Sequence, residues 1–150
     1  MKHGTIEDPY RYEYRVTPLS KAVLGSLLAG IIATVINLIY DHIYRGIAHY
    51  FFAEVFSLYA LIAFTILICM AGGIIYFLTD KYFTNGRVIY IILFIVLTVL
   101  GLFMHMISHM PNGDPIPSDA MGLKIGLDLI TGCSAAFLVP YLAEHSKIWA

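Results

Sequence analysis

Histidine and aspartate are the residue types in this chain best suited to chemistry. His105 and His109 are four residues apart and would lie on one face of a helix. Two imidazoles on one face can bind a divalent transition metal, and Asp41 or His42 could complete a site for zinc, copper or iron. We therefore predict a metal site from these four residues. The helical metalloprotease pattern His-Glu-x-x-His is absent, so the spacing does not indicate hydrolysis.

The same residues allow other interpretations. Asp128 beside His105 would change protonation near neutral pH, which is typical of proton or ion handling. His42 or His49 with His105 could instead hold a single b-type haem. Hydrogen bonds that merely hold helices in register explain the residues equally well. Sequence motifs for nucleophilic catalysis and for phosphate or dinucleotide binding are absent, so enzymatic activity stays an open question.

The elements that must position these residues are four long apolar segments. The chain of 150 residues is 59% hydrophobic and 13% charged, whereas soluble domains are roughly 45–50% apolar and about 25% charged. A helix of about 20 apolar residues crosses a bilayer. The segments 22–40, 55–79 and 88–113 carry no charge, and 125–143 carries only Asp128.

The predicted fold is therefore an all-α integral membrane protein, a single domain over residues 1–150. We expect a cytoplasmic arm at 1–21 and an antiparallel bundle of four transmembrane helices. The four helices are expected at about residues 21–44, 55–79, 87–110 and 119–143. The Asn85-Gly86 dipeptide predicts a tight turn between the second and third helices, and Pro140 a tolerated kink near the end of the fourth.

The distribution of lysine and arginine predicts the orientation, because positive charges are retained on the cytoplasmic side. Cytoplasmic termini leave Arg45 and Lys124 outside the cell. All other cations then lie inside: Lys2, Arg11, Arg15, Lys21, Lys81, Arg87 and Lys147. We expect an N-in, C-in topology, such as in a bacterial inner membrane.

Small residues indicate which helix faces pack together, because they let backbones approach closely. The predicted packing residues recur mostly at spacings of three and four: Gly25, Ala29, Ala33, Gly101, Gly122, Gly126 and Gly132. Asn37 and Asp41 continue the first series, and Asp128 is in line with Gly132. Counting about 1.5 Å per residue puts Asn37, His105 and Asp128 in one layer near the outer surface.

These observations predict a small membrane component, either homo-oligomeric or a subunit of a larger complex. Its outer layer of polar residues would bind a metal ion or another small ligand, or would serve only to register the helices. The predicted ligand or proton site consists of Asn37, Asp41, His42, His105, His109 and Asp128. Basic residues are too few and too dispersed for nucleic-acid binding, so the lipid bilayer is the main expected partner.

Overall fold

The computed structural model describes residues 17–48, 58–107 and 118–145, and every regular element in these parts of the chain is a helix. Most of the predicted arm at 1–21 lies outside them. The long helices are α1 (Pro18–Ala48), α2 (Leu58–Tyr82), α3 (Gly86–Ile107) and α4 (Ser118–Cys133). Helix α4 continues into a π-helical segment, η1 (Ser134–Leu138), and then into α5 (Val139–Glu144).

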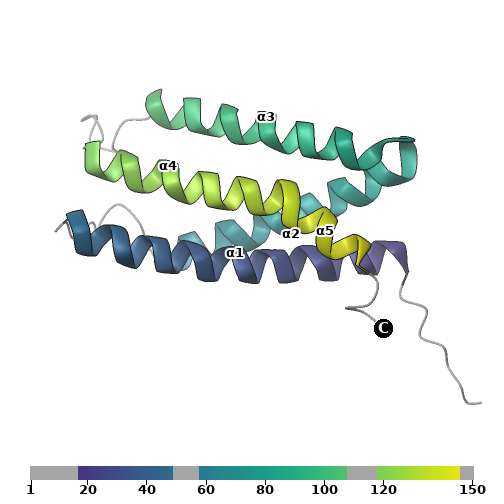
Figure 1. The fold of residues 1–150 in the computed structure, drawn as a ribbon, viewed down its shortest axis with the longest axis horizontal. Helices are drawn as coiled ribbons and strands as arrows, with labels where there is room; N and C mark the ends of the chain where they lie inside the picture. The colour runs from purple at the N-terminus through teal and green to yellow at the C-terminus, as the bar shows by residue number, and fades with distance from the viewer. Residues whose placement is uncertain (1–16, 49–57, 108–117, 146–150) are drawn as a thin grey trace, which may run out of the picture.

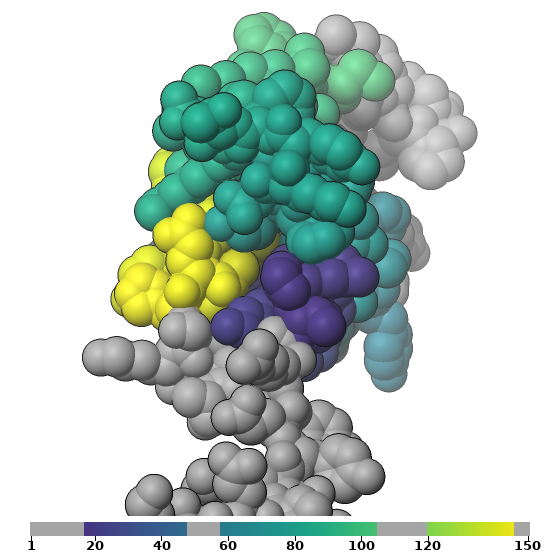
Figure 2. Space-filling view, turned by 90° about the vertical axis from the view of Figure 1, so that its right-hand side faces the viewer, coloured from purple at the N-terminus to yellow at the C-terminus, as the bar shows by residue number. Residues whose placement is uncertain are grey.

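The prediction of four helices that are long and apolar enough to cross a membrane is confirmed. The spans are Pro18–Ile47, Leu58–Tyr82, Gly86–Met104 and Ala120–Glu144. Figure 1 shows α4 between α1 and α3, with α2 crossing behind. Helix α1 packs against α2, α4 and α5, and α3 packs against α2 and α4. The start of α1, the end of α5 and the turn from α2 to α3 lie at one end of the molecule, which we call the Glu144 end (Figures 1 and 2). The opposite end we call the Asp41 end.

Local chemistry determines where α1 begins. Thr17 precedes the helix, and its hydroxyl oxygen accepts a hydrogen bond of 3.2 Å from the backbone N–H of Ser20. This N-cap pairs one of the amide hydrogens that have no partner within the helix. Pro18 follows at the first helical position, where its missing N–H costs nothing.

The turn between α2 and α3 depends on Gly86. Its backbone N–H donates to the Phe83 carbonyl at 3.2 Å and so closes a short turn. A Cβ at this position would lie 2.6 Å from the backbone nitrogen of Asp80. Only glycine permits this approach, which is why the Asn85-Gly86 dipeptide marks the turn.

Small side chains make up much of the buried interior, and most of the large apolar side chains lie on the outside. A Cβ on Gly25 would lie 2.9 Å from the backbone nitrogen of Ala143, so α1 and α5 nearly touch. Such close contact favours association of apolar helices through van der Waals forces, which is the main attraction available when the surrounding medium is as apolar as the side chains. The small apolar residues in the core are Ala22, Ala29, Ala33, Ala135 and Ala136.

The π-helical segment is explained by a proline and a tyrosine. In η1 the N–H of Val139 donates to the carbonyl of Ser134, five residues earlier. The next bond of this series would run from residue 140 to Ala135, but Pro140 has no N–H to donate. The hydroxyl of Tyr90, fully buried on α3, donates to the Ala135 carbonyl at 2.7 Å instead. Tyr90 therefore stabilises the irregular part of the fourth span.

Candidate functional site

Asn37 connects three helices in the interior of the protein. Its side chain is fully buried, and its Nδ2 donates to the Thr65 hydroxyl on α2 at 3.1 Å and to the Thr131 hydroxyl on α4 at 2.8 Å. Thr65 in turn donates to the carbonyl of Leu61 on its own helix. In an apolar interior an amide must find such partners. We call these three residues the Asn37 triad.

The triad is not saturated. Among the described residues, no donor lies within hydrogen-bond distance of the buried Oδ1 of Asn37. Thr131 accepts the bond from Asn37, which leaves its own hydroxyl hydrogen to be donated elsewhere. A buried amide oxygen without a donor is uncommon in native structures and is often paired by a water or a ligand.

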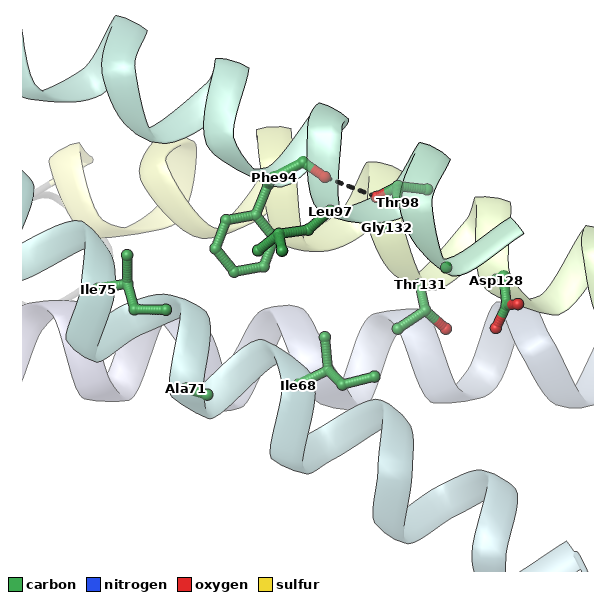
Figure 3. A pocket seen from close by; sticks show the side chains of 10 residues that line it. Ile68, Ala71, Ile75, Phe94, Leu97, Thr98, Asp128, Thr131 and Gly132 are labelled. Atoms are coloured by element: carbon green, nitrogen blue, oxygen red, sulfur yellow. Dashed lines mark hydrogen bonds between the residues drawn. The ribbon is translucent and has the colours of Figure 1, made fainter. Parts of the chain in front are cut away.

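Beside the triad lies a cleft of about 410 Å³ between α2, α3 and α4. Figure 3 shows α2 diverging from α3 and α4 toward the end of the cleft that holds Asp128. Most of the lining is apolar: Ile68, Ala71, Ile75, Phe94, Leu97, Gly101 and Gly132. A volume of this order is typical of sites for small organic ligands.

The polar groups of the cleft gather at one end. Thr131 and Asp128 lie there together, with Thr98 nearby on α3 (Figure 3). Thr98 donates to the carbonyl of Phe94 at 2.7 Å, so its hydroxyl oxygen remains able to accept. Asp128 is half-buried, and its Oδ2 atom is shielded from solvent. The cleft is thus amphipathic, with an apolar body and one end able to form hydrogen bonds.

Asp41 forms an ion pair within its own helix. The Nε of Arg45 lies 2.8 Å from Oδ1 and 2.9 Å from Oδ2 of Asp41. Asp41 is buried, but it is not part of the lining of the cleft beside Asp128. His42, its neighbour in the chain, is exposed on α1. Of the residues predicted to share one site, Asp41 and His42 therefore lie outside the cleft.

The predicted metal site falls mainly beyond what the structure describes. The backbone of His105 belongs to the last turn of α3, but its side chain lies outside the described part of the chain, as does all of His109. Within the described ranges, no three His, Cys, Asp or Glu side chains are close enough to hold a metal ion. The proposal that His105 and His109 bind metal stays a prediction.

The residues predicted for helix packing have different surroundings. Gly25, Ala29 and Ala33 lie on the buried face of α1, which also carries Asn37 and Asp41. On α4, Gly122 and Gly126 face the rings of Tyr44 and Tyr40, and Gly132 faces Thr98. Gly101 differs, because a Cβ added there would meet nothing within 4 Å. It lines the cleft.

Two residues at this site were missed by sequence reasoning. Thr131 and Thr65 look unremarkable in apolar segments, where threonine commonly bonds to its own backbone. A signal was present for Thr131, because it lies three residues after Asp128 and thus on the same helix face. No comparable signal pointed to Thr65.

Comparisons of the chain with protein-family models, with curated proteins and with solved structures gave no match.

Proposed function

We propose that the chain is an integral membrane protein that binds a small amphipathic ligand from the bilayer in the cleft between α2, α3 and α4. The observation that carries this proposal is the cleft of about 410 Å³ with apolar walls and with Thr98, Thr131 and Asp128 in its lining. The apolar walls suit a hydrocarbon or ring system, and the polar end suits a hydroxyl, carbonyl or similar head group.

The four spans form an antiparallel bundle in this proposal, with both termini in the cytoplasm. The described cations support this orientation, because Lys21, Lys81 and Arg87 belong to the Glu144 end and Arg45 and Lys124 to the other. The Glu144 end is then cytoplasmic, and the polar end of the cleft lies toward the outer surface. A bacterial inner membrane fits this arrangement.

Gly101 offers a way to test the cleft, because it lines the cavity and a side chain added there meets open space. A Gly101→Phe substitution should fill the cleft and leave the helices in place. The matched control is Leu100→Phe, one residue earlier on the exposed surface of α3. Each protein is purified in mild detergent, washed and extracted with organic solvent, and the extract is analysed by mass spectrometry.

We expect one lipid-soluble compound to be retained by the wild type and by Leu100→Phe, and to fall about tenfold in Gly101→Phe. The added ring would occupy space that the compound needs, and a steric cost of about 1.4 kcal/mol corresponds to that factor. Equal retention by all three proteins would place the compound outside the cleft. If the wild type retains nothing above bulk lipid, the ligand proposal is wrong.

The exposure of α3 favours a second function, the assembly of an oligomer or a larger complex. Only 11% of the most apolar stretch of α3 is buried, against 44% for α1. Such a helix could serve as the contact surface of a homo-oligomer or of a larger membrane complex, with the Asn37 triad only registering the helices. Light scattering of the detergent-purified protein separates the possibilities: a mass near 16.8 kDa after subtraction of detergent means a monomer.

A further inference from the structure

A second hollow, of about 520 Å³, lies on another side of the fourth span. Residues of η1 and α5 line it together with residues of α1 and α3, and we call it the η1 groove. Its apolar lining includes Ile36 from α1, Ile91 from α3 and Phe137 from η1. The η1 groove shares no lining residue with the cleft between α2, α3 and α4.

The η1 groove extends over about half the thickness of a bilayer core. Its lining on the fourth span extends from Cys133 to Tyr141, eight residues further on. At about 1.5 Å per residue this corresponds to roughly 12 Å, close to the depth of one leaflet, about 15 Å. Tyr141 lies near the Glu144 end and Cys133 toward the middle of the span. The groove therefore has the length and polarity of one lipid chain in one leaflet.

One cation lines the end of the groove that is nearest the surface of the membrane. Arg87 is the second residue of α3, and its side chain is 53% exposed. One of its terminal nitrogens lies 2.8 Å from Oε2 of Glu144, whose other oxygen accepts a 3.0 Å hydrogen bond from the hydroxyl of Tyr76. Glu144 thereby holds the guanidinium in place, while further N–H donors of its planar fork remain available.

We propose that the η1 groove binds one glycerophospholipid, with its phosphate on Arg87 and an acyl chain extending past Phe137 toward Cys133. A guanidinium that is already oriented matches the bidentate geometry of a phosphate. Because Glu144 offsets the charge of Arg87, recognition depends on directed hydrogen bonds to the phosphate more than on the net charge of the lipid. This second site is independent of the ligand proposed for the cleft and requires only that the helices cross a membrane.

Native mass spectrometry of the full-length, delipidated protein in detergent tests the proposal. The probes are dioleoylphosphatidylglycerol, dioleoylphosphatidylethanolamine and dioleoylglycerol, which has the same chains but no phosphate. We expect the two phospholipids to bind alike, with one per chain, and at least about tenfold more tightly than dioleoylglycerol, since a charge-assisted hydrogen bond corresponds to roughly that factor. Equal binding of dioleoylglycerol would overturn the proposal.

Three variants locate the phosphate site. Arg87→Gln should lose the bound phospholipid, whereas Lys81→Gln, which removes a cation outside the groove at the same end, should keep it. Glu144→Gln removes the negative charge, but its amide oxygen can still accept a hydrogen bond from the guanidinium, so this variant should also keep the lipid. Loss of the phospholipid in both Arg87→Gln and Glu144→Gln would mean that the ion pair only stabilises the fold. Retention of the phospholipid in Arg87→Gln would exclude Arg87 as the phosphate ligand.

The position of the acyl chain is tested separately with a phospholipid that carries a photoactivatable diazirine on its chain. We expect crosslinks within residues 133–141 and on Ile91, and their loss when Cys133→Trp fills the deep end of the groove. Crosslinks spread evenly over the exposed faces of all helices would show ordinary solvation by lipid and would contradict the proposal.

Discussion

At the scale of single residues, Asn37 shows how one buried amide can join three helices. Its two amide hydrogens reach hydroxyl groups on α2 and α4, so each of these helices is aligned against α1. A shift of either helix by one residue would leave a polar group unpaired in an apolar interior, which costs more than the bond itself is worth. The same physics makes the buried Oδ1 of Asn37 noteworthy, because the described residues offer it no donor.

We predict that Asn37→Ala lowers the free energy of unfolding by about 1–3 kcal/mol, since it removes two interhelical hydrogen bonds and leaves a cavity. Unfolding in mixed detergent micelles with increasing dodecyl sulfate measures this. Thr34→Ala is the control, because Thr34 is buried one turn earlier and its hydroxyl donates to the carbonyl of Gly30 on its own helix. A similar loss in both variants would show that the triad has no special role.

The predicted metal site can be tested separately. We expect detergent-purified wild type, prepared without chelator, to contain a divalent transition metal that the double variant His105→Ala, His109→Ala lacks. Elemental analysis by plasma mass spectrometry and an absorption spectrum for haem provide the measurements. A wild type with neither metal nor haem would exclude both interpretations.

At the scale of elements, the fourth span combines a π-helical segment with a proline and depends on a tyrosine from another helix. Tyr90→Phe should cost about 1–3 kcal/mol in unfolding free energy, because it leaves the buried carbonyl of Ala135 unpaired. In the background Pro140→Ala the same change should cost less than about 0.5 kcal/mol, since residue 140 then supplies an N–H. This double-mutant cycle tests the coupling directly, and additive effects would contradict it.

Two glycines that look equivalent in the sequence occupy different surroundings. Gly25→Ala places a Cβ 2.9 Å from the backbone nitrogen of Ala143, and backbone atoms cannot move aside cheaply. We expect a loss of about 1–3 kcal/mol. Gly101→Ala meets open space and gains helix propensity, so it should be neutral or stabilising by up to about 1 kcal/mol. Thermal unfolding in detergent compares them, and an equal loss would argue against close packing of α1 and α5.

At the scale of the whole molecule, most of the large apolar side chains lie on the outside, and small residues make up much of the interior, unlike in a soluble domain. The exposed set includes Ile31, Phe64, Leu67, Ile92 and Phe103. No soluble fold of this size would expose so much apolar surface, because the hydrophobic effect opposes it at about 25 cal/mol per Å². A bilayer removes that cost.

The orientation of the helices in the membrane can be tested by thiol labelling. In a background with Cys133→Ser, which removes the exposed native thiol, Asn112→Cys should react with a membrane-impermeant maleimide added to intact cells. Asn85→Cys should react only after the cells are opened, because the turn between α2 and α3 is expected in the cytoplasm. Gel-shift of the labelled protein provides the measurement, and the opposite pattern would invert the proposed orientation.

By itself the sequence determined the four long apolar helices and the turn between α2 and α3. These features depend on local quantities: the length of an apolar run, the rise of about 1.5 Å per residue, and the turn preference of Asn-Gly. The prediction that the chain is all-helical, with four helices able to cross a membrane, is confirmed for the described residues.

Only the tertiary structure decided which polar residues meet. Asn37 pairs with Thr65 and Thr131, and Asp41 pairs with Arg45 on its own helix and stays away from the cleft. Which residues face one another depends on the sliding and splaying of whole helices, which many weak packing contacts determine together. No single residue determines how these contacts add up. The cleft that opens where α2 diverges from α3 and α4 could therefore not be predicted from the sequence.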